Sequence, residues 1–421
     1  MSFERIILPN GMRLILVPKP DSLATTVAVS VEAGSKYETK EINGLSHFLE
    51  HMCFKGTRKR PKAIDIAAEL DGLGANYNAF TLQEMTSYYV KARNKSLDRI
   101  LDVIADMYLN PVFDQNEIEK ERGVIIEEIN MYEDTPQRKV QDLFMELVYG
   151  DQPAGWDIAG RKEVIQKLTR DDFIKYRDAH YVGKATAVVV AGSFDEKKLR
   201  EKIEDYFTPL SQGEKSPKVP VLEKQGAPAE LVKYKDSDQT HLVMGFRAFD
   251  IFDERRYALE VLTDILGGGM SSRLFEKIRQ ELGAAYYVRA GADLYSDHGL
   301  VLASAGVDHK KIEIVIKAAL EEFARFRTEE VGKEELERAK EHLIGHLFLS
   351  LETSDELAFY YALQEVQKLP LMTPEELAAK IKAVTAGEIR AVASDLFKNE
   401  GLNLAIIGPF KEKSFSAILK V

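Results

Sequence analysis

The sequence predicts an α+β protein of two homologous domains, each a mostly antiparallel sheet packed against helices. In each half of the 421-residue chain, strand-like segments come before long helical patterns, whereas a doubly wound fold would alternate the two. NEIEKER at residues 116–122 aligns with EELERAK at 334–340, 218 positions later, and VVVAGSF at 188–194 aligns with LAIIGPF at 404–410, 216 positions later. Two distant matches at nearly one offset indicate an internal duplication.

The first half begins with strand signals and continues with amphipathic helices. Apolar residues at alternating positions predict strands, and apolar residues at helical spacing predict helices. Pro9-Asn10-Gly11 marks a turn between the first two strands. The expected strands are residues 5–8, 12–17, 25–31, 75–79, 86–91 and 185–191. The expected helices are residues 44–54, 64–73, 97–108, 116–132 and 169–181, of which the third is stopped by Pro111.

A segment of different composition separates the two halves. Four prolines and two glycines lie in and around residues 210–229, which show almost no periodicity and are typical of a linker. We therefore expect an N-terminal domain at residues 1–213, a linker at 214–230 and a C-terminal domain at 231–421. In the second half the expected strands are residues 241–246, 285–294 and 299–305, and the expected helices are 257–267, 272–282 and 312–323.

Composition and charge exclude several classes of protein. Lys and Arg number 57 against 68 Asp and Glu, a net charge of −11, which disfavours a nucleic-acid partner. No stretch approaches 18 consecutive apolar residues, and the N-terminus shows no signal-peptide pattern. A single cysteine, Cys53, cannot form an internal disulfide. We expect a cytoplasmic globular protein without a nucleic-acid or membrane partner.

The sharpest local signal is the pentapeptide His47-Phe48-Leu49-Glu50-His51. On a helix, residues four apart share a face, so the two imidazoles can converge on one metal ion. Glu50 then reaches the open side of the metal as a base rather than as a ligand. This is the inverted H-x-x-E-H arrangement. A catalytic zinc site normally has three protein ligands plus a water, so a third ligand is required.

The third ligand is expected in the stretch from Glu121 to Glu128. These two carboxylates are seven residues apart, on one helical face that they share with Ile125. Glu127 lies about 100° away, on a side typical of solvent. We assign Glu128 as the ligand and Glu121 as a nearby carboxylate that supports the site.

Other polar residues favour structural interpretations. A hydrogen-bonded histidine pair remains the alternative for His47 and His51, although their mostly apolar segment favours a metal. His342 and His346 have the same spacing without an acid between them, so we interpret them as structural. Cys53 falls on the wrong helical face for the same metal and is interpreted as a buried apolar thiol.

Several motifs, in order along the whole chain, resemble the pitrilysin/insulinase-type (inverzincin) metallopeptidases. The similarity is greatest to their half-length branch of bacterial processing peptidases and mitochondrial processing peptidase subunits. The motifs are Leu8 with Asn10-Gly11, residues 44–52 (GLSHFLEHM), Lys55-Gly56-Thr57, Asn78-Ala79-Phe80-Thr81, Glu121-Arg122-Gly123 leading to Glu128, residues 267–275 (GGGMSSRLF), and Arg279 with Tyr286.

This resemblance implies a zinc-dependent endopeptidase with one Zn²⁺ per chain. It places zinc on His47, His51 and Glu128, with Glu50 activating the water. It places Asn78 and Ala79 on an edge strand that pairs with substrate backbone, consistent with β-augmentation. The family's arginine–tyrosine pair corresponds to Arg279, which holds substrate, and Tyr286, which helps hold the oxyanion.

The resemblance also implies an assembly. Longer relatives build a closed chamber from four such domains, so a two-domain chain implies a dimer. We expect a homodimer that admits peptides and unfolded segments as substrates. A non-catalytic binding subunit is the rival class, disfavoured because His47, Glu50, His51 and Glu128 are all present. A heterodimer whose partner supplies the arginine–tyrosine pair is disfavoured because this chain carries both residues.

Overall fold

A computed structural model of the chain describes residues 2–421. They form two compact units that are interleaved along the chain. Unit 1 contains the residues up to Ile129, Asp157–Val219 and Phe348–Thr373, and unit 2 contains Asn130–Trp156, Pro220–Leu347 and Pro374–Val421. Each unit combines one sheet with helices, which confirms the α+β class. The expected domain limits at residues 213 and 231 describe the duplicated segments and stay a prediction. The two compact units do not test them, because each unit contains residues from before and after these limits.

Unit 1 is built on a six-stranded sheet. Its strands are β1 (Glu4–Ile7), β2 (Arg13–Pro18), β3 (Ala24–Val31), β4 (Asn76–Thr81), β5 (Thr86–Arg93) and β6 (Thr186–Gly192). They lie in the order β1-β2-β6-β3-β5-β4, antiparallel except for the parallel pair β2 and β6. The side chains of the central strands, such as Val27, Val29 and Val189, are fully buried. Strands this apolar are typical of a sheet that is covered on both faces.

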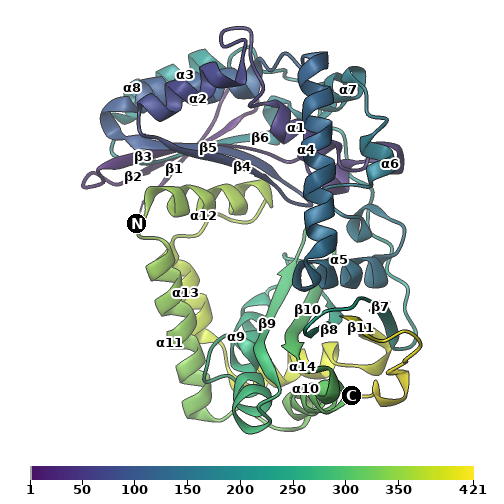
Figure 1. Cartoon of the computed structure of the whole chain (residues 1–421). Coiled ribbons are helices and arrows are strands. Elements are labelled where there is room, and N and C mark those ends of the chain that lie inside the picture. The colour runs from purple at the N-terminus through teal and green to yellow at the C-terminus, as the bar shows by residue number, and fades with distance from the viewer. Residues whose placement is uncertain (1) are drawn as a thin grey trace. The chain divides into compact units, whose positions relative to one another are not determined.

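Helices cover both faces of this sheet. α12 (Ser354–Val366) packs on β3 and β6, whereas α3 (Leu97–Leu109) packs on β3 and β5 and carries α8 (Glu196–Phe207). Figure 1 shows α12 on the side of the sheet opposite to α3 and α8. The other helices that contribute to unit 1 are α1 (Leu45–Met52), α2 (Ala63–Gly72), most of α4 (Gln115–Asp134), α6 (Lys162–Ile165) and α7 (Arg170–His180).

Unit 2 contains a five-stranded sheet. Its strands are β7 (Ala229–Tyr234), β8 (Thr240–Ala248), β9 (Ala285–Leu294), β10 (Gly299–Val307) and β11 (Leu402–Gly408), in the order β7-β11-β8-β10-β9. β7 and β11 are parallel and the other pairs are antiparallel. This is the pairing pattern of β2-β6-β3-β5-β4 in unit 1. The shared pattern supports the duplication expected from the two sequence matches.

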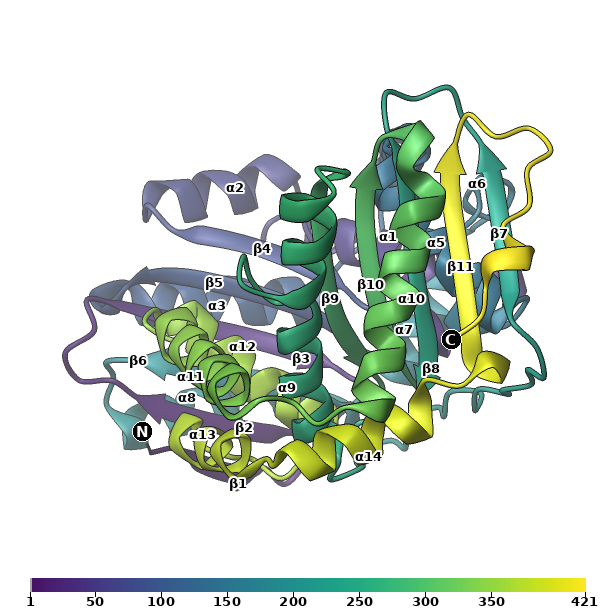
Figure 2. The ribbon, with the colours of Figure 1, turned by 90° about the horizontal axis from the view of Figure 1, so that it is seen from below.

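The helices of unit 2 lie on both faces of its sheet. α5 (Pro136–Tyr149) packs on β8 and β11, with Val140, Leu143 and Phe144 against Val243 and Ala405. α14 (Ala386–Leu396) contacts both α9 (Arg256–Gly267) and α10 (Ile312–Thr328), and all three helices contact strands of the sheet. Figure 2 shows α10 lying over the sheet. The remaining helices are α11 (Lys333–Ser350), α13 (Pro374–Ala383) and a π-helix at Phe275–Glu281, where the sequence predicted an ordinary helix over 272–282.

The two units have exchanged one helix each. α5 comes from the first half of the chain but packs on the sheet of unit 2. α12 begins 218 positions after α5 and packs on the sheet of unit 1. The boundaries between the units fall inside α4, after Ile129, and inside α11, after Leu347. Two equivalent helices therefore occupy each other's places.

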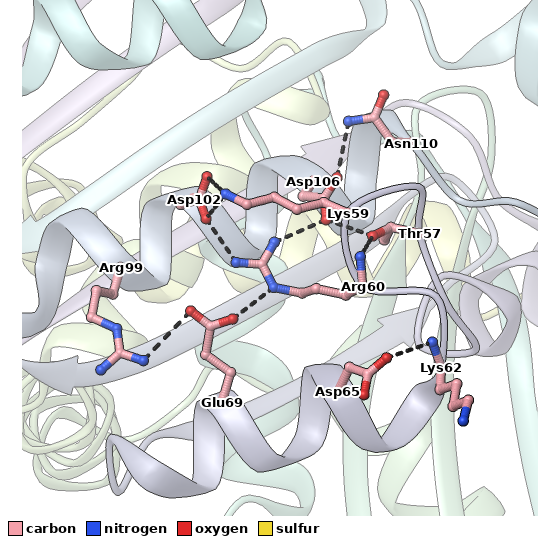
Figure 3. A network of polar contacts seen from close by, with 10 residues as sticks. All are labelled: Thr57, Lys59, Arg60, Lys62, Asp65, Glu69, Arg99, Asp102, Asp106 and Asn110. Atoms are coloured by element: carbon pink, nitrogen blue, oxygen red, sulfur yellow. Dashed lines mark hydrogen bonds and ion pairs between the residues drawn. The ribbon is translucent and has the colours of Figure 1, made fainter.

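A buried ionic cluster anchors the loop that follows α1 (Figure 3). The Arg60 side chain is 5% exposed, and its guanidinium donates to Glu69 at 2.8 Å, Asp102 at 2.7 Å and Asp106 at 2.9 Å. Thr57 donates to the same Asp106 carboxylate at 2.5 Å. Charged groups are tolerated in the interior when each has partners. The cluster thus fixes the loop after α1 relative to α2 and α3.

Candidate metal centre

Helix α1 presents two imidazoles side by side. The apolar residues of the helix, among them Phe48, Leu49 and Met52, are fully buried, and this fixes the rotation of the helix. The rings of His47 and His51 then lie 4.7 Å apart between centroids, with an interplanar angle of 71°. The structure therefore brings the two histidines of the pentapeptide together, as their spacing predicts.

Helix α4 supplies a third donor to the same place. Oε2 of Glu128 lies 3.7 Å from Nε2 of His47 and 3.7 Å from Nε2 of His51. Buried Ile125 and Ile129 hold this turn of α4 in place. Within residues 2–421, His47, His51 and Glu128 are the only set of three His, Cys, Asp or Glu donors that lie within 4.8 Å of one another. Glu127, on the neighbouring face, is exposed and not a member of the set.

The donor set fits a zinc ion. Two imidazoles and a carboxylate are common ligands of catalytic zinc, and with bonds of about 2.0–2.2 Å the donors of a tetrahedral site lie about 3.4 Å apart. The two separations of 3.7 Å between Glu128 and the imidazole nitrogens are close to this value, and all three donors lie within 4.8 Å of one another. The three side chains are between 12% and 23% exposed, so the centre is accessible to solvent.

Burial keeps one of the imidazoles neutral. It lowers the pKa of His47 to about 4, and the neighbouring His51 acts in the same direction. A histidine must be neutral to bind a metal, so His47 is in its binding form at neutral pH. Nδ1 of His47 is buried and has no hydrogen-bond partner among residues 2–421, whereas Nε2 is the nitrogen that faces Glu128.

His51 is oriented by a carboxylate behind it. Oε1 of Glu121 lies 2.9 Å from Nδ1 of His51, and Oε2 of Glu121 lies 2.6 Å from Nζ of Lys55. Burial acts to lower the pKa of His51. The hydrogen bond with Glu121 and the nearby carboxylates outweigh burial and raise this pKa. Burial acts to raise the pKa of Glu121, but the hydrogen bonds from His51 and Lys55 outweigh it and lower this pKa. Such a carboxylate–histidine pair fixes the ring and leaves Nε2 for a metal.

Glu50 is held beside the three donors without joining them. It is 8% exposed, and burial raises its pKa, while a hydrogen bond from Thr81 acts in the opposite direction. Oγ1 of Thr81 lies 2.6 Å from Oε2 of Glu50. A buried carboxylate with a raised pKa is a good general base or acid near neutral pH. The sequence motif included Thr81, but its contact with Glu50 could not be deduced from spacing.

A buried glutamate caps the start of α1. Gly44 has a φ of 94°, and a Cβ there would lie 2.7 Å from the carbonyl oxygen of Ala159, so the position requires glycine. The carboxylate of Glu38 accepts from the backbone N–H groups of Gly44 and Ser46, both at 2.7 Å. Burial raises the pKa of Glu38 to about 7. Glu38 lies outside the recognised motifs, and no spacing signal identified it.

The predicted substrate strand lies at an edge of the sheet. Within residues 2–421, β4 pairs with β5 alone. Asn78 is exposed and its side-chain oxygen accepts from the N–H of Ala79 at 2.9 Å. An edge strand has backbone groups free for another chain. Pairing of Asn78 and Ala79 with substrate stays a prediction.

Arg279 and Tyr286 meet within unit 2. Arg279 lies in the π-helix and Tyr286 at the start of β9. The guanidinium donates to the carbonyl oxygen of Tyr286 and lies 5.9 Å from the centre of its ring. The Tyr286 side chain is 73% exposed. Their roles toward substrate stay predictions.

The remaining candidates have structural partners. Nδ1 of His342 lies 2.8 Å from Oδ1 of Asp264, and its ring is 4.4 Å from that of His346. Cys53 is fully buried, and its thiol donates to Tyr88 at 3.4 Å. Burial raises the pKa of Cys53 to about 11. A thiol with this pKa is unreactive at neutral pH.

Comparison with known proteins identifies the class. Residues 13–162 match the family described as Insulinase (Peptidase family M16), and residues 167–343 match its Peptidase M16 inactive domain. The chain is 35% identical over 407 residues to the uncharacterized zinc protease YmxG of Bacillus subtilis, covering 96% of this chain and 98% of the relative. It is 36% identical over 415 residues to an uncharacterized zinc protease of Rickettsia felis, covering 97% and 98%. The chain belongs to the insulinase-type peptidase family M16.

Solved structures show the same fold. A protease from Helicobacter pylori superposes with a TM-score of 0.89 at 23% identity, covering 97% of this chain and 99% of that one. A peptidase M16 inactive domain from Pseudomonas fluorescens superposes with a TM-score of 0.90 at 17% identity, covering 98% and 100%. Among residues 2–421, no helix combines the length and hydropathy that crossing a bilayer requires.

Proposed function

We propose that the chain is a zinc-dependent endopeptidase that binds one zinc ion per chain through His47, His51 and Glu128. The observation that carries the proposal is the convergence of these three donors, from two helices separated along the chain, within 4.8 Å of one another. The inverted H-x-x-E-H spacing and the zinc-protease relatives support the same assignment.

The chemistry divides between the metal and Glu50. Bound zinc polarises the scissile carbonyl and makes water a stronger nucleophile near neutral pH. Glu50 removes a proton from the attacking water and returns it to the leaving amine. Glu121 acts as a positioning carboxylate by holding His51, and the raised pKa of Glu50 suits a group that gains and loses a proton.

We propose two sets of substrate contacts, one on β4 and one at Arg279 and Tyr286. We propose that the edge strand around Asn78 and Ala79 pairs with the peptide backbone, a mode that tolerates varied side chains. We assign Arg279 to substrate binding and Tyr286 to stabilisation of the oxyanion. The exposure of Tyr286 leaves its hydroxyl available to a ligand.

The proposed assembly is a cytoplasmic homodimer. Two such chains would enclose a chamber whose entry restricts substrates to peptides and unfolded segments. Light scattering coupled to size exclusion tests the assembly directly: twice the chain mass is expected, and a monomer at working concentration contradicts it.

The decisive test compares wild type with Glu50→Gln on a mixed peptide library, with and without a chelator. We expect wild-type cleavage to stop with chelator, and Glu50→Gln to lose about 10²- to 10⁴-fold in kcat while retaining zinc. His51→Ala should lose zinc and activity together, whereas Glu41→Gln, an exposed glutamate, should match wild type. Cleavage that persists with chelator and in Glu50→Gln contradicts the proposal.

A further inference from the structure

The hydroxyl of Thr81 makes a short hydrogen bond to the proposed general base. Thr81 is the last residue of β4, opposite Thr86 on β5. Its Oγ1 lies 2.6 Å from Oε2 of Glu50, a distance typical of a hydrogen bond between a hydroxyl and a carboxylate. Glu50 is 8% exposed, so little water competes for this oxygen.

The surrounding contacts show which group donates. The hydroxyl of Thr86 is fully buried and donates to the carbonyl oxygen of Ala33 at 2.9 Å. Oγ1 of Thr86 and Oγ1 of Thr81 are 3.4 Å apart. A hydroxyl has one proton, so Thr86 has none left for Thr81. The proton of Thr81 is then directed to Glu50, whose ionised carboxylate only accepts.

We propose that Thr81 is a positioning residue for the reaction. Its hydroxyl holds Oε2 of Glu50 and leaves Oε1 as the oxygen that receives the proton from water. The inference rests on the proposed function, because the contact matters for turnover only if Glu50 is the general base. In this role Thr81 contributes to the reaction without binding the metal or carrying a proton.

The position of Thr81 on β4 gives the contact a second consequence. Ala79 and Thr81 are two residues apart on a strand and therefore face the same side. The strand proposed to pair with substrate is thus the strand that holds the base. A peptide paired along β4 would lie in a fixed register relative to Glu50, so that one peptide bond faces the base.

The variant Thr81→Val tests this role because valine keeps the branched shape and removes the hydroxyl. We expect kcat to fall by about 10- to 100-fold, as misplacement of a catalytic group does. KM and zinc content should stay within about twofold of wild type, since neither involves the hydroxyl. Thr81→Ser restores the donor and should recover most of kcat. Thr208→Val is the control, because Thr208 is exposed and its hydroxyl, among residues 2–421, donates only to the backbone carbonyl of Glu204 at the end of α8.

A second measurement does not depend on activity. In crystal structures of metal-free wild type and Thr81→Ser, the Glu50 carboxylate should occupy one position in contact with residue 81. In Thr81→Val it should turn away or occupy several positions. Thermal unfolding of each variant checks that it is folded.

The outcomes separate the inference from the function on which it rests. Wild type that cleaves in a chelator-sensitive way while Thr81→Val keeps full kcat overturns the role of Thr81 alone. Loss of zinc, or a rise in KM with unchanged kcat, also overturns it, because the residue would then act on the metal or on substrate binding. Wild type without chelator-sensitive cleavage overturns the proposed peptidase and this role together.

Discussion

Neutralising Glu121 should weaken zinc binding although Glu121 is not a ligand. Its carboxylate is 7% exposed and lies 2.9 Å from Nδ1 of His51, with Lys55 on its other oxygen. It therefore fixes the ring of His51 and increases the electron density at Nε2. Glu121→Gln keeps the shape and an acceptor but removes the charge.

The size of the effect follows from that geometry. Loss of a carboxylate behind a ligating histidine weakens metal binding by about 10- to 100-fold, equivalent to about 1.4–2.7 kcal/mol at about 1.36 kcal/mol per factor of ten. Because glutamine still accepts a hydrogen bond, we expect about 10-fold for Glu121→Gln and up to about 100-fold for Glu121→Ala. Competition with a chromogenic zinc chelator at pH 7 measures the dissociation constants.

Two variants on the same helix calibrate the measurement. Glu128→Gln removes a ligand and should weaken zinc binding more than Glu121→Ala does. Glu127→Gln neutralises an exposed charge next to the ligand and should bind zinc as wild type does. The reasoning is refuted if Glu121→Ala binds zinc as tightly as wild type, or if Glu127→Gln is weakened as much as Glu128→Gln.

Two further predictions concern stability in unit 1. Arg60→Met leaves the buried carboxylate of Asp106 without its main counter-charge and should lower the free energy of unfolding by about 3–5 kcal/mol. Urea titration checks this, with Lys59→Met, 58% exposed, expected below about 1 kcal/mol. The second prediction concerns Glu84. Its burial acts to raise its pKa, but Lys36 and Lys218 outweigh burial and lower this pKa from 4.5 to about 2. Because the folded pKa is depressed, this stabilisation is present above pH 4.5 and lost as the pH falls toward 2, about 3 kcal/mol in all. The stability deficit of Glu84→Gln should therefore shrink between pH 5 and pH 3 in urea titrations; a constant deficit would contradict the assignment.

The sequence predicted local elements better than their arrangement. β3 follows from valines at alternating positions, and β6 follows from a run of valines typical of a strand that is buried on both faces. The exchange of α5 and α12 could not be predicted, because an apolar helical face in a sequence does not indicate which sheet it will cover. Which sheet each one covers depends on contacts far apart in the sequence, such as the packing of Phe144 with Val243 and Ala405.

The same distinction applies to the candidate site. The spacing of His47 and His51 and the helical face of Glu128 are local properties that the sequence shows. That Glu128 meets the two histidines is set by the tertiary fold, and it was expected only because a third ligand is required and because of the family resemblance. Glu38 and Thr81 lie on segments whose distance from α1 is set by the tertiary fold. No periodicity relates them to the histidines. Residues that orient a site are therefore harder to predict than residues that form it.

A histidine pair in unit 2 shows what the proposed metal centre of unit 1 has in addition. There the carboxylate of Asp264 lies 2.8 Å from Nδ1 of His342, and the rings of His342 and His346 are 4.4 Å apart, close to the arrangement on α1. Within residues 2–421, however, this pair does not belong to a set of three donors within 4.8 Å. A histidine pair at helical spacing with a carboxylate behind it is therefore not enough to bring three donors together. What distinguishes unit 1 is Glu128, a donor from a separate helix, and the proposed metal centre needs this residue as well as the histidine motif.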